Sequence, residues 1–209
     1  MIDEIKPQLW IVAGPNGAGK STLVAQHALA RQIIIINPDD IAERIGPGHQ
    51  GETAVKAQAG REALQRRKAL LEERQTFGIE TTLTGRSEIQ LMCQAKEQGY
   101  KVNLVYVGLD RVEKSSSRVG IRVLKGGHDV PEADILRRFG RSLGNLPGAI
   151  RAADRVFVLD NSGRQYRLVC SIEIGHLRFM AKAVSTWAIQ ALEKAGFEPD
   201  GYIQKGVSL

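Results

Sequence analysis

The feature that most constrains this chain is a glycine-rich segment near the N-terminus that matches the pattern G-x-x-x-x-G-K-[ST]. Glycines let the backbone curl so that successive N–H groups point at phosphate oxygens. An apolar run at 8–13 precedes the segment and a predicted helix at 21–31 follows it, so a positive helix end would face the same phosphates. These flanks argue against a chance match by a glycine-rich turn. The segment comprises Gly14, Pro15, Asn16, Gly17, Ala18, Gly19, Lys20 and Ser21, and Thr22 follows it.

Such a loop predicts binding of ATP, or a close relative, together with Mg²⁺. Lys20 is expected to reach the β and γ phosphates, and Ser21 to offer its hydroxyl to the metal. The same loop serves motors, GTPases, transport ATPases and small-molecule kinases, so the rest of the chain has to decide the function.

Strands and helices alternate along the chain, which predicts a mostly parallel sheet with helices on both faces. Four consecutive isoleucines at 33–36 are typical of a strand buried on both faces. A turn at 161–163 and a strand at 166–174 predict a hairpin. The other expected strands are 8–13, 78–83, 100–109 and 155–159, and the expected helices are 21–31, 51–77, 87–98, 110–123, one opened by Pro131, and 182–195.

These elements predict a three-layer α/β P-loop NTPase fold with a helical basic lid. We expect a single kinase-like domain over residues 1–209. Its core would span about 8–162, its lid about 111–145, and a C-terminal hairpin and helix about 163–200.

Composition excludes several classes of protein. Hydrophobic residues make up 43% of the 209 residues, enough for a substantial core. No run of about 18 apolar residues could span a membrane, and the charged N-terminal segment is unlike a secretory signal. Cys93 and Cys170 are predicted to be buried free thiols, which suits a cytoplasmic location. The four histidines show no metal-ligand spacing, so no zinc site is expected.

The net charge of +6 raises the question of a nucleic-acid partner. The basic residues concentrate between 111 and 155, however, where they would surround a polyphosphate. Aromatic residues are only 5% of the chain and do not interleave with basic ones, which counts against stacking on bases. We therefore do not expect nucleic acid to be the partner.

Carboxylates follow two of the predicted strands, at the sheet edge where ligands of open α/β sheets bind. Asp39 is the predicted catalytic base for an acceptor hydroxyl, and Asp40 is expected to cap the helix that follows. Glu80 and Thr82 alternate onto one side of their strand, and Arg86 lies just beyond. A charge such as Glu80 in an apolar strand needs a partner.

Asp110 and Asp160 also end apolar strands. Either resembles a metal-holding aspartate, but such positions often cap the next turn, and we favour that interpretation. We expect Asn161 and Ser162 to lie near the adenine, because the loops that follow the last strands of such sheets often do.

Arginines on two predicted helices bracket a glycine-rich segment, and this arrangement predicts a lid that folds over phosphate. Pairs four residues apart share a helix face and repel unless an anion joins them. The alternative is a solvated basic face. The basic residues concerned are Arg118, Arg122, Lys125, Arg137, Arg138 and Arg141, around Gly126-Gly127-His128.

Together, the loop at 14–21, Asn37-Pro38-Asp39-Asp40, Ile79-Glu80-Thr81-Thr82 and the basic lid resemble the zeta toxin family, over about residues 8–162. Within it, the chain is most similar to short bacterial proteins labelled predicted ABC-type ATPases or kinases. The resemblance implies a small-molecule kinase that transfers phosphate from ATP to a hydroxyl of a nucleotide sugar such as UDP-N-acetylglucosamine.

By the same resemblance, Asp39 would be the base, and Glu80, Thr82 and Arg86 would contact the sugar nucleotide. Arg122 and either Arg137 or Arg138 would clamp the β and γ phosphates. An antitoxin protein is an implied partner. The chain is shorter than the larger toxins, which puts the substrate in doubt more than the fold.

Two other functions remain open. One is a nucleotide-switched module that hydrolyses ATP slowly and acts through protein partners, and the other is a polynucleotide kinase. ATP turnover that depends on an added metabolite would distinguish a small-molecule kinase from the first.

Overall fold

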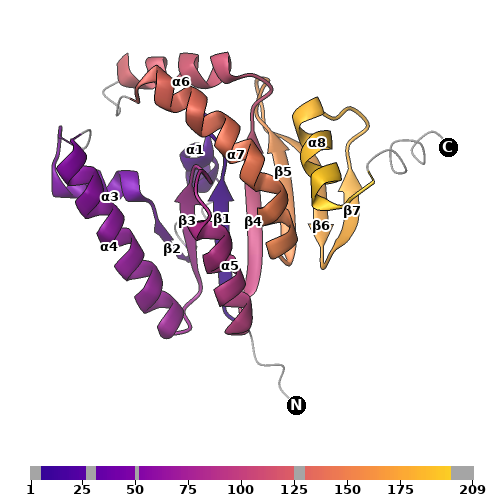
Figure 1. Cartoon of the computed structure of the whole chain (residues 1–209), viewed down its shortest axis with the longest axis horizontal. Coiled ribbons are helices and arrows are strands. Elements are labelled where there is room, and N and C mark those ends of the chain that lie inside the picture. The colour runs from indigo at the N-terminus through magenta and orange to yellow at the C-terminus, as the bar shows by residue number, and fades with distance from the viewer. Residues whose placement is uncertain (1–5, 27–31, 50–51, 125–129, 199–209) are drawn as a thin grey trace.

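A seven-stranded sheet in the order β2-β3-β1-β4-β5-β6-β7 forms the centre of the protein, seen in a computed structural model that describes residues 6–26, 32–49, 52–124 and 130–198 (Figure 1). β1 to β5 pair in parallel, and β6 and β7 continue the sheet antiparallel. The strands are β1 (Gln8–Ala13), β2 (Ile34–Ile36), β3 (Phe77–Thr81), β4 (Lys101–Gly108), β5 (Arg155–Asp160), β6 (Arg167–Glu173) and β7 (His176–Met180).

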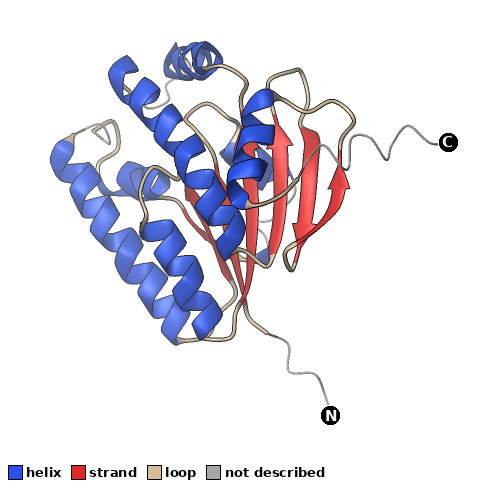
Figure 2. Ribbon diagram, turned by 45° about the vertical axis from the view of Figure 1, so that its right-hand side comes forward, coloured by secondary structure: helices blue, strands red, loops and turns tan. Residues whose placement is uncertain are grey.

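Helices cover both faces of this sheet, as Figures 1 and 2 show. α5, α7 and α8 lie on one face, α1 lies on the other, and α3 and α4 pack together beside the β2 edge. α6 crosses the end of the sheet at which the parallel strands finish. The helices are α1 (Lys20–Gln26), α3 (Pro38–Ile45), α4 (Thr53–Glu72), α5 (Ser87–Glu97), α6 (Val112–Leu124), α7 (Glu132–Ala152) and α8 (Thr186–Ala195).

The core lies between the central strands and the helices on their faces. Leu9, Ile11, Phe77 and Leu104 are fully buried, because β1, β3 and β4 are covered on both faces. The hydroxyl of Tyr106 on β4 lies 3.0 Å from that of Ser142 on α7, so this buried phenol has a polar partner. The core therefore fixes the strand ends from which the site is built.

The predicted fold class is confirmed: the chain has a P-loop kinase-like α/β fold with a mostly parallel sheet. The predicted hairpin is present as β5 and β6. Gly196 ends α8 in the left-handed conformation, at φ 95°, where glycine carries no steric penalty. β7, which completes the antiparallel edge, was not predicted.

Four local predictions were wrong. The isoleucine run does not form a strand buried on both faces, because β2 is a three-residue edge strand in which Ile34 is 56% exposed. Asn37, and not Asp40, caps α3, since its side-chain oxygen accepts a hydrogen bond from the Asp39 N–H. Ser87 does not cap α5 through its side chain. Cys93 and Cys170 are both free, but Cys93 is exposed.

The middle of the predicted lid cannot be compared with the structure, because Lys125 and Gly126-Gly127-His128 lie outside the described residues. Among the described helices, none is both long enough and apolar enough to cross a membrane.

Candidate active site

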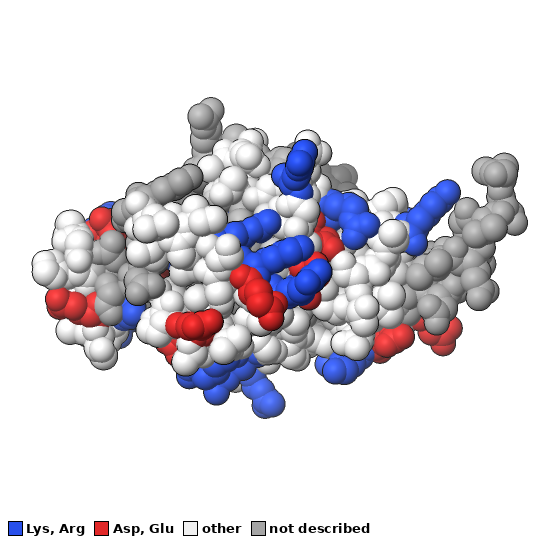
Figure 3. Space-filling model, turned by 90° about the horizontal axis from the view of Figure 1, so that it is seen from above, with Lys and Arg blue, Asp and Glu red and all other residues white. Residues whose placement is uncertain are grey.

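A cleft of about 850 Å³ lies at the carboxyl ends of the parallel strands, bounded on one side by α6 and α7. Seen from above in Figure 3, Lys and Arg side chains gather near the middle of this face, with acidic side chains beside them. Its lining includes residues of the glycine loop, of the ends of β2 and β3, and of α4 to α7. They are Asn16, Gly17, Gly19, Lys20, Ser21, Thr22, Asn37, Pro38, Asp39, Arg67, Glu80, Thr81, Thr82, Thr84, Glu88, Arg118, Ile121, Arg122, Arg137, Arg138 and Arg141.

The glycine loop joins β1 to α1 and adopts conformations that only glycine takes without strain. Gly14, Gly17 and Gly19 have φ of 144°, 68° and 98°. A Cβ on Gly14 would lie 2.1 Å from the carbonyl oxygen of Val107, so the loop starts with its backbone pressed against β4. Lys20 is buried at the N-terminus of α1, and its ammonium donates to the Pro15 carbonyl 3.1 Å away.

Several carbonyl oxygens of the loop accept hydrogen bonds from side chains further along the chain. Ser115 donates to Asn16 O at 2.5 Å, Asn161 donates to Ala18 O at 2.8 Å, and Tyr166 donates to Gly19 O at 2.7 Å. Arg118 donates to Asn161 O at 2.8 Å and lies 3.5 Å from Gly17 O. Within the loop, the Ala18 N–H donates to the Pro15 carbonyl at 3.3 Å. These bonds hold the loop in a curled conformation of the kind that binds anions.

Asn161 therefore supports the glycine loop. The sequence did not reveal this role, because the hydrogen-bond partner of Asn161, Ala18, lies 143 positions away. Ser162 lines a second, smaller cavity with Arg111, Lys114 and Arg118. The side chain of Asp160 accepts from the Ser162 N–H at 2.8 Å, so it caps a turn as expected. Asp110 instead forms an ion pair with Lys114 at 3.0 Å.

Glu80 at the end of β3 lies against the loop. Its Oε1 accepts a hydrogen bond from the Ser21 hydroxyl at 2.7 Å. Burial raises the pKa of Glu80, opposed by the charge of Lys20 and the Ser21 hydrogen bond. Burial likewise lowers the pKa of the Lys20 ammonium, opposed by Glu80 and Asp39. Lys20 and Glu80 are therefore a buried cation and a buried carboxyl group beside the loop, and Thr82 also lines the cleft.

Asp39 and Asp40 lie in the first turn of α3 but face different spaces. Asp39 lines the main cleft, whereas Asp40 lines an adjoining cavity beside α1 and β2 that shares Ser21, Asn37 and Glu80 with the cleft. Asp40 accepts from the Asn37 amide at 3.3 Å. Burial and then the neighbouring Asp39 raise the pKa of Asp40. The structure thus brings Asp39, but not Asp40, into the same cleft as Lys20.

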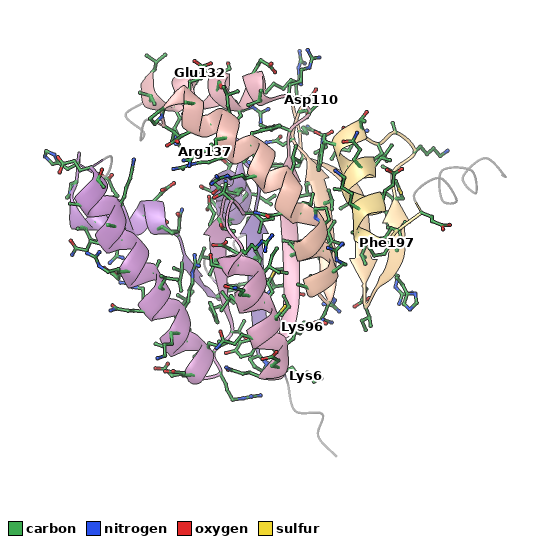
Figure 4. The ribbon with its side chains drawn as sticks, viewed as in Figure 1. Lys6, Lys96, Asp110, Glu132, Arg137 and Phe197 are labelled. Atoms are coloured by element: carbon green, nitrogen blue, oxygen red, sulfur yellow. The ribbon has the colours of Figure 1, made fainter. Side chains whose placement is uncertain are left out.

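The predicted lid arginines converge on the cleft from α6 and α7. Arg122, Arg137, Arg138 and Arg141 all line it, and Arg137 lies on α7 above the strand ends (Figure 4). Arg137 makes a 2.7 Å ion pair with Asp134, whereas Arg138 is 3.8 Å from that carboxylate and less exposed. Arg118 is bound to backbone carbonyls and braces the loop.

The sequence analysis missed two buried charged residues of the cleft, and one residue that it predicted is not in the cleft. Arg67 on α4 and Glu88 on α5 are buried and line the cleft. Arg67 continues the buried stripe Ala59, Ala63 and Leu71 at four-residue spacing, a signal that the sequence does carry. Arg86 is exposed at the N-cap of α5 and is not among the cleft-lining residues.

This donor set fits a nucleoside triphosphate with Mg²⁺. The glycine cradle has no room for a Cβ at Gly14, and a buried lysine stands at the helix end where phosphate binds. Among the described residues, no cluster of three or more His, Cys, Asp or Glu side chains could hold a metal by itself. A magnesium ion would then be held by Ser21 and by phosphate oxygens, as in other loops of this type.

Several solved structures share this fold. The complex of AvrRxo1-ORF1 and AvrRxo1-ORF2 with ATP matches 92% of this chain at a TM-score of 0.69 and 17% identity, and this chain spans 64% of the matched chain. The PezAT chromosomal toxin-antitoxin system of Streptococcus pneumoniae matches 97% of this chain, and 85% of its own, at a TM-score of 0.59 and 19% identity. At these identities the likeness establishes the fold alone.

Sequence comparison gives a nearer relationship. An uncharacterized protein of Haemophilus influenzae is 37% identical over 142 residues, which cover 65% of this chain and 99% of that protein. The sequence profile of a family described as an AAA domain matches residues 9–140, more than half of the chain, from β1 through the glycine loop into α7. The chain therefore belongs to this AAA-domain family, with a P-loop kinase-like domain.

Proposed function

We propose that this protein is an ATP-dependent phosphotransferase of the zeta-toxin type, which phosphorylates an alcohol group of a small nucleotide-sugar-type metabolite such as UDP-N-acetylglucosamine. The observation that carries the proposal is that Lys20 on α1 and Asp39 on α3 line the same cleft. A kinase needs a phosphate site and a carboxylate facing a shared space in which the acceptor fits. The resemblance to zeta toxins supplies the class of acceptor.

In this mechanism, the glycine loop and Lys20 would hold the β and γ phosphates, and Ser21 would hold the Mg²⁺ that comes with ATP. Asp39 accepts the proton of the acceptor hydroxyl. The acceptor oxygen then bonds to the γ-phosphorus as the bond from that phosphorus to the β–γ bridging oxygen breaks, leaving ADP. Arg122 and Arg138 stabilise the charge that spreads over the transferring group. By the resemblance to zeta toxins, Glu80 and Thr82 would contact the acceptor.

The test is transfer of label from ATP, marked on its γ-phosphate, to a pool of soluble metabolites that includes nucleotide sugars. A labelled phosphomonoester that requires Lys20 and Asp39 supports the proposal. Label that appears only as inorganic phosphate, with or without the pool, contradicts it and favours the nucleotide-switched module.

A polynucleotide kinase is the second candidate, favoured by the net charge of +6. An RNA repair complex that contains Pnkp1 shares the fold at a TM-score of 0.54 over 68% of this chain. Oligonucleotides with free 5′ hydroxyls, added as a separate acceptor, distinguish this candidate from the first.

The toxin-type proposal extends to a protein partner and a location. An antitoxin that covers the nucleotide cleft would be the partner, and the protein would act in the cytoplasm. Loss of ATP binding on addition of a candidate antitoxin protein would test the partner.

A further inference from the structure

The cleft contains a buried arginine, Arg67, that the phosphate-transfer mechanism does not use. Arg67 on α4 is 7% exposed and Glu88 on α5 is 8% exposed, and both line the cleft. They belong to a different wall from the lid arginines of α6 and α7. A guanidinium in this position is costly to bury unless an anion compensates it.

Glu88 compensates Arg67 only in part. Its Oε1 lies 3.6 Å from Nη1 of Arg67, longer than the 2.7–2.9 Å typical of charge-assisted hydrogen bonds. Its other oxygen accepts from the Ser87 hydroxyl at 3.0 Å, and its place in the first turn of α5 suits a negative charge. Nε of Arg67 is buried with no hydrogen-bond partner among the described residues. Glu88 therefore has a second polar partner, whereas one buried nitrogen of Arg67, Nε, has none among the described residues.

We propose that Arg67 binds an anionic group, a phosphate or a carboxylate, on the phosphoryl acceptor, at a point remote from the hydroxyl that reacts. The guanidinium offers a fork of donors that suits either oxyanion, and Glu88 competes with the ligand for it. The site would thereby select charged acceptors over neutral ones. This inference rests on the proposed function only in taking the cleft beyond the loop as the acceptor site.

The test measures binding and not turnover, so it is independent of phosphate transfer. The full chain is saturated with Mg²⁺ and a non-hydrolysable ATP analogue, which blocks the glycine loop. Glucose 1-phosphate, gluconate and neutral glucose are then titrated separately and followed by NMR. The first two probes distinguish a phosphate from a carboxylate, and glucose reports binding without an anion. The wild type is expected to prefer one of the anions to glucose by about 10-fold or more.

Arg67→Gln is expected to abolish this preference, and Arg66→Gln, an exposed neighbour paired with Glu62, to leave it unchanged. The double variant Arg67→Gln/Glu88→Gln removes both buried charges and should also lose it, which covers the case in which Arg67→Gln alone fails to fold. Glu88→Gln should bind the anion several-fold more tightly, because a competing carboxylate is gone.

If Arg67 and Glu88 form only a structural ion pair, the variants should not show this pattern of anion preference. Anion preference that survives in the folded double variant, or that is lost in Glu88→Gln as fully as in Arg67→Gln, overturns the proposal, as does a wild type that binds glucose as well as both anions. Transfer to an acceptor without Arg67-dependent anion binding would refute this inference alone. The converse result, anion binding without transfer, would refute the proposed kinase function alone.

Discussion

Glu80→Gln is the perturbation that best separates two roles for this carboxylate. The resemblance to zeta toxins assigns Glu80 to the acceptor, but the structure has it accepting the Ser21 hydroxyl hydrogen at 2.7 Å. If this bond directs the Ser21 lone pair at Mg²⁺, Glu80 acts on nucleotide binding through the metal. The amide oxygen of glutamine still accepts the hydrogen, but as a neutral group.

The expected loss follows from the strength of that bond. A hydrogen bond to a charged group contributes roughly 1.5–3 kcal/mol, and a neutral one about half as much. Changes of partners that orient a metal ligand typically cost 10–100-fold in metal affinity. We therefore expect Mg²⁺-dependent ATP affinity to fall by about 10-fold or more. Without metal, ATP should bind no worse than to the wild type, because a negative charge beside Lys20 has been removed.

Isothermal titration with ATP, in Mg²⁺ and in EDTA, measures both effects on one protein. Glu62→Gln on α4 is the matched control, since this carboxylate pairs with surface arginines away from the loop. Unchanged affinity in Mg²⁺, together with a raised KM for the acceptor, would refute the role through Ser21 and restore Glu80 to the acceptor.

Three further predictions concern the remaining site residues. Asp39→Asn should lower turnover by about 10²-fold or more, and Asp40→Asn by less than about 3-fold, because only Asp39 lines the main cleft; the reverse order in steady-state assays would exchange their roles. Arg138→Ala should lower the single-turnover transfer constant by on the order of 10²-fold and Arg138→Lys should restore it only partly, while Arg66→Ala is the control; equal, small losses would mean that the arginines form a solvated face. The raised pKa of Glu80 means that the folded state holds this proton more tightly than the unfolded state does, so in EDTA the wild type should lose stability as the pH rises from about 4.5 through the raised pKa. Glu80→Gln should not show that loss in thermal melts across this range; parallel curves for the two proteins would show that Glu80 is not the titrating group.

The sequence predicted those parts of the fold that depend on local pattern. The glycine loop was found because its chemistry requires particular residues at fixed spacing, and Gly14 has no room for a side chain. Parallel strands were found from their apolar runs. The isoleucine run gave a wrong prediction of burial on both faces. Edge and central strands can have the same residues and differ only in their neighbours, and Ile34 lies on the edge strand.

The site was predicted where residues follow a strand directly, and missed where tertiary packing decides. Asp39 and Glu80, which follow or end parallel strands, both line the cleft. Arg67 lies mid-helix among other charged residues, and only its register with the buried alanines of α4 marks it. Asn161 meets the loop only after the chain has folded, so no local signal could identify its role.

The central claim is that the cleft transfers phosphate to an alcohol rather than to water. The most direct measurement is a single turnover with γ-labelled ATP and the acceptor from the metabolite screen, followed by separation of labelled acceptor from inorganic phosphate. We predict that the wild type places most of the label in the acceptor, and that Asp39→Asn slows this transfer by about 10²-fold or more. Label released as inorganic phosphate at the same rate with and without acceptor would contradict the account.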